Sequence, residues 1–212
     1  MRKAIVSGAN GFVGSAVVKE LISQGYEVYA LVRENHYDQV PINEMVRIVP
    51  FSLENIEALG EVIPINEYEA FYHFAWNGSA GVDRADTALQ LKNAQWTVEC
   101  LQMAKRLGCK RFVPAGSIME HETIAAVYTQ GNRPGAGYIY GSGKVAAHMM
   151  CMSMAVKEGI NLVWPKITNA YGPSERSPRL VNSTIRKCIA GEDPQFTAGT
   201  QNYDFVYIDD VA

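Results

Sequence analysis

The sequence lacks a hydrophobic run long enough to cross a membrane. Its longest weakly polar stretch, residues 146–156, contains His148 and Ser153 and is shorter than the roughly 20 residues that a spanning helix needs. The N-terminal residues 1–8 include two basic residues but only a very short apolar run, whereas a signal peptide needs about 7–15 apolar residues. We therefore expect a first strand here, and a cytoplasmic protein without a membrane partner.

Cysteine and surplus charge are also scarce. The four cysteines among 212 residues form no CxxC pair and show no metal-site spacing with histidine, so we expect free, buried thiols and no metal. The 19 Lys and Arg against 22 Asp and Glu give a formal net charge of −3, and no basic cluster stands out. This is ordinary globular composition, and a nucleic-acid partner is not expected.

Short apolar runs alternate with segments of helical length. We predict strands at residues 4–7, 27–32, 46–51, 70–75, 111–115 and 161–167, and helices at residues 11–24, 53–62, 83–107 and 141–158. This alternation is typical of βαβ units, and hence of an α/β fold with a Rossmann-type, doubly wound parallel sheet. Residues 118–137 are predicted to form a loop above the sheet, and residues 203–212 a strand that turns into a helix.

A glycine-rich turn joins the first predicted strand to the first predicted helix. Gly8, Gly11 and Gly14 have the GxxGxxG spacing, which permits a tight turn and a close approach of the backbone to a pyrophosphate. The helix N-terminus then offers free N–H groups to the phosphates. The strand before the turn and the helix after it favour a dinucleotide site over a merely structural turn.

The end of the second predicted strand bears on the choice of dinucleotide. An acidic residue there favours NAD, whereas an arginine accommodates the 2′-phosphate of NADP. Val32 stands where the acid would be expected, and Arg33 follows it. We therefore expect NAD or NADP, with NADP slightly favoured. Arg33 as a solvated strand-end residue, with Glu34 in the acid's place, stays an alternative.

Tyr140 and Lys144 are four residues apart at a predicted helix start and therefore share one face of the helix. A tyrosine pKa is ordinarily about 10, and we expect the lysine ammonium and a bound nicotinamide to lower it. The phenol can then exchange a proton with a substrate hydroxyl while a hydride moves. Ser117, just after the strand at residues 111–115, can donate to the substrate oxygen. The plainer reading is an exposed tyrosine, a solvated lysine and a turn serine.

Together these motifs resemble the extended short-chain dehydrogenase/reductases, the NAD-dependent epimerase/dehydratase family, which acts mostly on nucleotide sugars. The resemblance covers essentially the whole chain and includes the glycine turn, His-Phe-Ala-Trp at 73–76, Asn-Ala-Tyr-Gly-Pro at 169–173, and residues 203–211. It implies that Ser117, Tyr140 and Lys144 are catalytic. The cofactor contacts that we predict come from Gly8, Asn10, Gly11, Phe12, Val13, Gly14, Arg33, Phe74, Ala75 and Asn93.

On the substrate side, the resemblance points to Asn169, and His121 is a second candidate from the predicted loop. It further implies a Rossmann domain in residues 1–168, the beginning of a small substrate domain in residues 169–212, and a homodimer through the helix after Lys144. The family continues past residue 212, so we expect a truncated chain that binds cofactor but fails at turnover. We also expect the last short helix, cut after its first turn, to leave its apolar face unburied.

Several positions depart from the family pattern. Ser52 stands where an Asp commonly touches the adenine, Lys166 replaces a common Arg, and Tyr203 replaces an Arg that helps to bind the substrate diphosphate. Ile118 and Met119 follow Ser117, whereas the 4,6-dehydratases carry an Asp-Glu pair there. Because water elimination needs those carboxylates, a dehydratase is disfavoured.

We therefore predict an NAD(P)-dependent nucleotide-sugar epimerase or ketoreductase. One alternative is an NADPH-dependent reductase of a small non-nucleotide ketone, with Phe71, Tyr72, Trp76 and the region of Tyr128 and Tyr138 lining an apolar pocket. Another is a catalytically silent NAD(P)-binding protein, since fold alone does not prove chemistry. His73 is expected to be a hydrogen-bonded core residue rather than a ligand.

Overall fold

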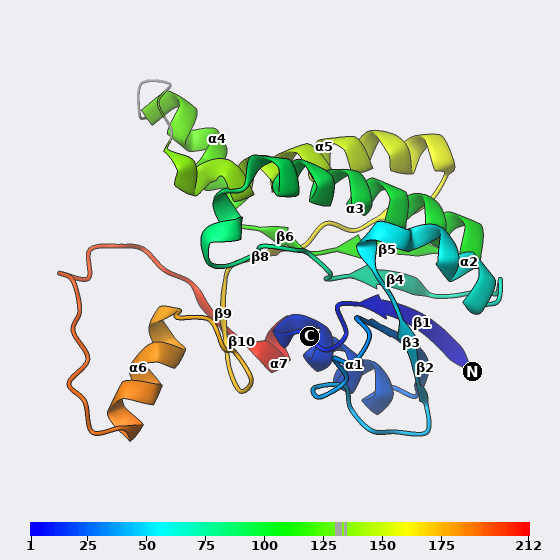
Figure 1. The fold of residues 1–212 in the computed structure, drawn as a ribbon, viewed down its shortest axis with the longest axis horizontal. Coiled ribbons are helices and arrows are strands. Elements are labelled where there is room, and N and C mark those ends of the chain that lie inside the picture. The colour runs from blue at the N-terminus through cyan, green and yellow to red at the C-terminus, as the bar shows by residue number, and fades with distance from the viewer. Residues whose placement is uncertain (130–132, 134) are drawn as a thin grey trace.

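The computed structural model describes residues 1–129, 133 and 135–212 (Figure 1). Its strands are β1 (Arg2–Ser7), β2 (Tyr26–Val32), β3 (Val46–Pro50), β4 (Ala70–His73), β5 (Arg111–Pro114), β6 (Gly116–Ser117), β7 (Asn161–Leu162), β8 (Lys166–Ile167), β9 (Asn169–Tyr171) and β10 (Phe205–Tyr207). Its helices are α1 (Phe12–Ser23), α2 (Leu59–Val62), α3 (Thr87–Leu107), α4 (Met119–Thr129), α5 (Ile139–Glu158), α6 (Leu180–Ile189) and α7 (Ile208–Val211). Three 3₁₀ turns complete the list, η1 (Leu53–Ala58), η2 (Val82–Ala85) and η3 (Ala136–Tyr138).

Six strands form one parallel sheet in the order β3-β2-β1-β4-β5-β7. Helices α2, α3 and α5 cover one face, and α1 covers the other (Figure 1). Because both faces are covered, the central strands are apolar throughout rather than alternating, and residues 4–6 of β1 and 28–32 of β2 are almost fully buried. The predicted α/β, doubly wound fold is confirmed.

The chain leaves β1 for one side of the sheet and β4 continues on the other side, so the strand order reverses between these two strands. Ser7, the last residue of β1, lies opposite Leu31 of β2 and His73 of β4. Ligands of open α/β sheets bind in the crevice at such a switch point, beyond the carboxyl ends of the strands. The topology therefore directs the search for a site to the segments after β1, β2 and β4.

The prediction of a loop for residues 118–137 is wrong in its first part, because Met119–Thr129 forms α4. The residues of this helix include no glycine or proline, and its start is fixed by side chains. Ser117 Oγ accepts from the Met119 amide at 3.2 Å, and Glu120 Oε1 accepts from the Ser117 amide at 2.8 Å, a reciprocal pair resembling a capping box. Residues 130–132 and 134 of the predicted loop lie outside the described residues.

Three other predicted elements are divided in the structure. The strand predicted at 161–167 is two short strands, β7 beside β5 and β8 beside β6. The helix predicted at 53–62 is η1 followed directly by α2, and η1 itself is kinked at Asn55, whose φ of −138° is not helical. The helix predicted at 83–107 is η2 followed by α3, because the Asp86 side chain accepts from the Leu89 amide and begins a new helix.

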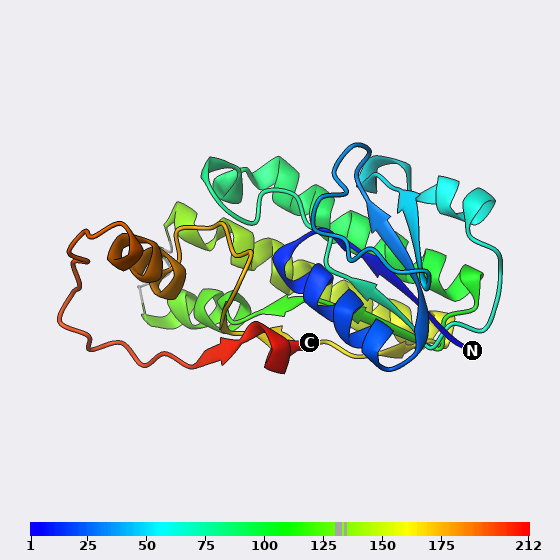
Figure 2. The ribbon, with the colours of Figure 1, turned by 90° about the horizontal axis from the view of Figure 1, so that it is seen from below.

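Residues 169–212 leave the sheet and return to it (Figure 2). β10 pairs with β9, and α7 packs against α1. The predicted strand-to-helix turn is thus confirmed, whereas α6 was not predicted. The expectation that the short last helix leaves its apolar face unburied is wrong, because Ile208 is 4% exposed and packs against Gly172.

Three of the four free cysteines are buried as expected, but Cys188 is exposed on α6, which contradicts the prediction for that residue. In the part of the chain that the structure describes, no helix is long and apolar enough to traverse a bilayer. The same residues hold no group of three or more His, Cys, Asp and Glu side chains placed to bind a metal ion.

Candidate active site

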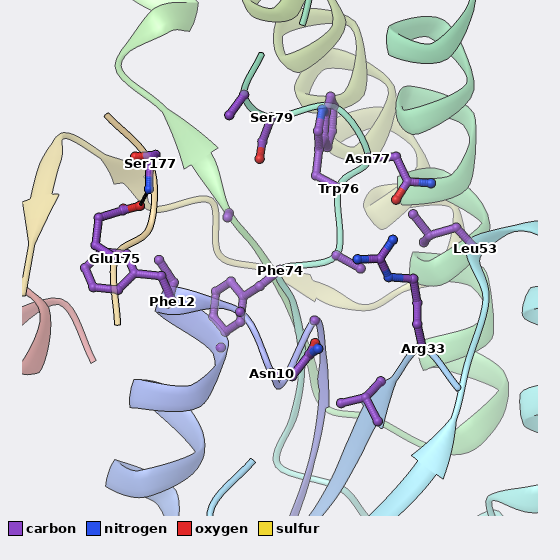
Figure 3. Close-up of a pocket in the computed structure, with 18 of the residues that line it drawn as sticks. Asn10, Phe12, Arg33, Leu53, Phe74, Trp76, Asn77, Ser79, Glu175 and Ser177 are labelled. Carbon is purple, nitrogen blue, oxygen red and sulfur yellow. Dashed lines mark hydrogen bonds between the residues drawn. The ribbon is translucent and has the colours of Figure 1, made fainter. Parts of the chain in front are cut away.

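A cavity of about 550 Å³ opens at the carboxyl ends of β1, β2 and β4 (Figure 3). Its walls come from the glycine turn, from the segments after β2 and β4, from η1, and from residues 175–179 after β9. The cavity therefore lies at the switch point of the sheet. Seven of the ten predicted cofactor contacts line the cavity from the segments that follow β1 and β2: Gly8, Asn10, Gly11, Phe12, Val13, Gly14 and Arg33.

The glycine turn is packed so closely that side chains are excluded. Gly8 has a φ of +66°, and a Cβ atom on it would lie 2.8 Å from the Ala75 amide nitrogen. A Cβ atom on Gly14 would collide with the carbonyl oxygen of Gly8. No described side chain caps α1, so the first-turn amides of Phe12, Val13 and Gly14 point into the cavity without helical partners. Free amides at a helix N-terminus fit the pyrophosphate of a dinucleotide.

The far end of the cavity suits an adenosine. Leu31, Val32, Phe51 and Leu53 give it apolar walls, and Arg33 extends along its rim beside Leu53 (Figure 3). Asn10 shapes this end indirectly, since its side-chain amide donates to the His36 carbonyl oxygen at 2.8 Å. The residues present therefore fit both the phosphates and the adenosine of the expected cofactor.

Phe74 and Ala75 line the cavity after β4, whereas Asn93 does not. Asn93 is 1% exposed, and its side chain forms two hydrogen bonds with the backbone of Asn77, at 2.8 and 2.9 Å. Asn77 is the residue that lines the cavity. The structure therefore places Asn93 behind the wall, where it holds the loop after β4 in position.

The three predicted catalytic residues come together next to the cavity, but none of them is among its lining residues. Lys144 is 5% exposed, and its Nζ donates to the Ala115 carbonyl oxygen at 2.9 Å. Lys144 Nζ lies 5.8 Å from the ring centroid of Tyr140, and Tyr140 hydrogen-bonds with the Ser117 side chain. These residues come from two elements, β6 and α5, that are over 20 positions apart in sequence.

Trp76 and Arg84 form the cavity wall next to this group. Lys144 Nζ lies 3.5 Å from the Trp76 ring centroid, and the rings of Trp76 and Tyr140 meet edge to face at 5.9 Å. The Arg84 guanidinium carbon lies 4.5 Å above the Tyr140 ring. Both Trp76 and Arg84 line the cavity, so Tyr140 and Lys144 lie directly behind them.

The expectation that Lys144 lowers the pKa of Tyr140 is wrong for the protein alone. Burial raises the pKa of Tyr140 above its ordinary value, and this effect exceeds the lowering by the Ser117 hydrogen bond and the nearby charge of Arg84. Burial also lowers the pKa of Lys144 to about 7. Lys144 is protonated only in part near pH 7, so its positive charge lowers the pKa of Tyr140 less than a fully charged ammonium would, which explains the difference from the expectation.

The part of the cavity lining formed by residues 175–179 was missed by sequence reasoning. Arg179, Ser177 and Glu175 follow β9, and Glu175 Oε1 accepts from the Ser177 amide at 2.8 Å (Figure 3). Arg84 of η2 also lines the cavity, and its buried Nε has no hydrogen-bond partner among the described residues. Their place in the sequence could have indicated them, since Arg84 and Arg179 each lie in the segment that follows the carboxyl end of a strand.

Two predicted substrate residues lie outside the cavity. Asn169 is in β9, paired opposite Phe205, and does not line the cavity. His121 is exposed at the start of α4, where its Nε2 accepts from Lys166 Nζ at 3.1 Å.

The aromatic residues proposed for an apolar pocket also lie elsewhere, apart from Trp76. Phe71 is fully buried in the core, and Tyr128 is 83% exposed on α4. His73 is confirmed as a core histidine, with Nδ1 2.8 Å from Ser7 Oγ and a pKa that burial lowers to about 3.

Residues 4–212 match the model of the NAD dependent epimerase/dehydratase family. The chain belongs to this family. It is 26% identical over 221 residues to UDP-glucuronic acid decarboxylase 1 of Xenopus tropicalis, covering 99% of this chain and 52% of that protein. It is also 26% identical over 217 residues to the dTDP-6-deoxy-L-talose 4-dehydrogenase (NAD(+)) of Aggregatibacter actinomycetemcomitans, covering 98% and 76%. The chain thus spans about half the length of the decarboxylases that it matches.

Solved structures of similar fold include two epimerases. The UDP-N-acetylglucosamine 4-epimerase of Methanobrevibacter ruminantium has a TM-score of 0.80 at 19% identity, covering 99% of this chain and 70% of that one. The UDP-glucuronic acid 4-epimerase of Bacillus cereus, solved in complex with NAD, has a TM-score of 0.74 at 21% identity, covering 99% and 71%. These likenesses establish a shared fold for essentially the whole chain of this family member.

The lowered pKa of Lys144 predicts how the stability of the protein changes with pH. Between the Lys144 pKa of about 7 in the folded protein and its ordinary value of 10.5, the unfolded chain holds a proton that the folded protein has lost. The free energy of unfolding of the wild type, relative to Lys144→Met, should therefore rise by a few kcal/mol from pH 7 to 10.5. Urea unfolding at several pH values measures this. Lys157→Met, which removes an exposed lysine from the same helix, is the control, and a flat difference for Lys144→Met would contradict the prediction.

Proposed function

We propose that this chain is the cofactor-binding part of an NAD(P)-dependent nucleotide-sugar epimerase or ketoreductase. The observation that carries the proposal is the meeting of Ser117, Tyr140 and Lys144 directly behind Trp76 and Arg84, two lining residues of the cavity that fits a dinucleotide. When bound there, the nicotinamide ring would accept a hydride from the substrate carbon or return one to it.

The chain's own residues handle the proton. Tyr140 as the phenolate takes the proton of a sugar hydroxyl, and as the phenol it returns that proton to the keto oxygen. Ser117 donates a hydrogen bond to the same substrate oxygen, and it lowers the pKa of Tyr140. Lys144, bound to the Ala115 carbonyl oxygen, supplies a positive charge that favours the phenolate as it forms. The raised pKa of Tyr140 in the protein alone means that binding of cofactor and substrate has to complete this activation.

Two guanidinium groups support a nucleotide sugar as substrate. Arg84 and Arg179 both line the cavity, and the positive charges of both lower the pKa of Tyr140. Arginine suits phosphate groups because its planar fork can form two parallel hydrogen bonds. We infer that these two residues bind the substrate diphosphate. In the family pattern this role belongs to an arginine at the position that Tyr203 occupies here. This charged wall disfavours a small apolar ketone, whose proposed aromatic pocket is not formed.

The same geometry disfavours a dehydratase. Ile118 and Met119 provide no carboxylate after Ser117, and the neighbouring Glu120 carboxylate is 1% exposed and accepts from the Ser117 amide and from Trp164 Nε1. It is therefore engaged away from the cavity. We further propose the domain division predicted above, with the substrate-binding region beginning at residue 169, since Glu175, Ser177 and Arg179 supply one cavity wall.

Retention of the cofactor separates an epimerase from a reductase. An epimerase restores its cofactor in each cycle and can keep it bound, whereas a reductase must exchange it. Denaturing the purified protein and measuring the absorbance and mass of any released nucleotide distinguishes the two. Stoichiometric NAD⁺ favours the epimerase, and nucleotide-free protein that oxidises added NADPH in the presence of a keto sugar nucleotide favours the reductase.

Replacing Tyr140 tests the catalytic proposal. Tyr140→Phe should lower kcat by about 10²–10⁴-fold, because it removes the proton-transferring group, and should leave cofactor affinity largely unchanged. Turnover is measured with a panel of nucleotide sugars, and affinity by titration calorimetry. Tyr128→Phe, an exposed position on α4, is the matched control. Undiminished turnover in Tyr140→Phe would assign the proton to another residue.

Replacing Arg33 tests the preference for NADP, which the NAD-bound structures of similar fold do not address. We expect the wild type to bind NADP⁺ more tightly than NAD⁺, and Arg33→Ala to weaken NADP⁺ binding by about 10-fold or more through loss of a charged hydrogen bond. NAD⁺ affinity should change little. Lys19→Ala removes an exposed cation from α1 as a control. Equal losses for both dinucleotides, or tighter NAD⁺ binding by the wild type, would favour Glu34 as the ribose-binding residue.

We also propose that the chain forms a homodimer through α5. Met149, Met152 and Val156 are 61%, 50% and 85% exposed and share one face of this helix. A row of exposed large apolar side chains is typical of an interaction surface.

The dimer is tested by light scattering after size exclusion. The wild type should have about twice the chain mass of 23.4 kDa. The double variant Met149→Glu, Met152→Glu should be a monomer, because dimerisation would have to bury two carboxylates from each chain. Val62→Glu, an exposed apolar position on α2, should stay dimeric. A monomeric wild type would refute the proposal.

A further inference from the structure

Glu120, in the first turn of α4, is a carboxylate that the chemistry above does not use. It is 1% exposed, and three groups converge on it. Oε1 accepts from the Ser117 amide at 2.8 Å and from Trp164 Nε1 at 3.0 Å, and Oε2 lies 2.8 Å from His148 Nδ1. Burying a carboxylate is costly unless its oxygens are hydrogen-bonded, and here both are.

The three groups that meet at Glu120 belong to separate elements of the fold. Ser117 is in β6, His148 is in α5, and Trp164 is in the segment between β7 and β8. The rings of His148 and Trp164 stack in parallel with centroids 4.4 Å apart. Trp164 in turn lies against β6, where a Cβ atom on Gly116 would come 2.5 Å from its Nε1. Glu120 therefore ties the strand that carries Ser117 to the helix that carries Tyr140 and Lys144.

We propose that Glu120 is a positioning residue that fixes Ser117 by its backbone and supplies a buried negative charge that opposes the deprotonation of Lys144. The first part rests on the hydrogen bond from the Ser117 amide. The second rests on charge, since His148 follows Lys144 by one helical turn and brings Glu120 to the Lys144 face of α5. The inference depends on the proposed function only for the catalytic roles of Ser117, Tyr140 and Lys144.

Other charged or titratable groups face this part of the molecule. His73 of β4 is buried and neutral, since its pKa is about 3, so it adds no positive charge against Lys144. Arg84 and Arg179 lie on the cavity side of Tyr140, and His121 with Lys166 lies at the exposed start of α4. Against these neutral or positive groups, the negative charge of Glu120 raises the pKa of Lys144 and of Tyr140, opposing the burial of the ammonium.

A purely structural role for Glu120 predicts a different outcome. If the carboxylate only completes the start of α4, its replacement lowers the stability of that helix and leaves the titration of Lys144 where it was. If it acts as we propose, removing its charge makes the Lys144 ammonium easier to deprotonate. The position of the Lys144 titration therefore separates the two roles.

The experiment is an NMR titration of the Lys144 side chain, followed through its ¹³Cε shift in labelled protein and assigned by its absence in Lys144→Arg. In Glu120→Gln, which keeps the shape and an acceptor oxygen, the midpoint should fall by about one pH unit. Glu122→Gln removes an exposed carboxylate from the same turn of α4 and is the matched control, with no comparable shift. An unchanged midpoint in folded Glu120→Gln would overturn the proposal.

A second measurement does not need a variant. In the wild type, the Ser117 amide proton should resonate well downfield at neutral pH, because it is donated to a carboxylate. A resonance in the ordinary amide range would overturn the proposal even if Glu120→Gln failed to fold.

Activity gives the third readout and keeps the two proposals apart. In Glu120→Gln, the limb of the kcat profile that follows Lys144 deprotonation should move to lower pH with the NMR midpoint. A moved midpoint in a protein whose wild type binds neither NAD⁺ nor NADP⁺ would refute the proposed function and leave the charge effect of Glu120 standing. Normal wild-type turnover with an unmoved midpoint would refute the charge effect of Glu120 and leave the proposed function standing.

Discussion

The backbone-to-backbone contact of the glycine turn is the constraint on which the rest of the site depends. Gly8 touches the segment after β4, and Gly14 touches Gly8, so strand, turn and helix α1 meet with no room for a side chain. This contact brings the α1 N-terminus over the carboxyl edge of the sheet and fixes one wall of the cavity. Every other cavity residue is placed relative to that wall, including Phe74 and Ala75, which follow β4 directly.

The region next to the cavity that holds Lys144 and Tyr140 is governed by a balance of burial and charge. Lys144 is buried and Tyr140 is half-buried, and removal from water disfavours the charged form of each, so neither is poised for catalysis by the other alone. The Ala115 carbonyl oxygen and the Trp76 ring hold the ammonium from two directions. A site arranged in this way is completed by its ligands, which bring the remaining charges, rather than preformed in the protein alone.

The features that the sequence predicted well are those with local signals. The glycine spacing between a strand and a helix, and the four-residue spacing of Tyr140 and Lys144, each depend on one short segment, and the sheet follows from the alternation of apolar runs. Arg84 and Arg179 were missed because only the folding of η2 and of the segment after β9 brings them into the lining of the same cavity. Asn93 was expected at the cofactor, but the bend after β4 places Asn77 there instead and leaves Asn93 bonded behind it. The loop prediction for residues 118–137 averaged over the whole segment, whereas the glycines cluster after residue 130 and α4 contains none.

The uneven burial of the cysteines has a practical consequence for spectroscopy. Burial raises the pKa of the Cys100, Cys109 and Cys151 thiols, which suppresses their reactive thiolates, whereas Cys188 lies exposed on α6. A maleimide dye or spin label would therefore attach at a single place without mutagenesis. That place follows residues 175–179 along the chain and is outside the cavity lining, so the label would report on movement of this wall without blocking the site.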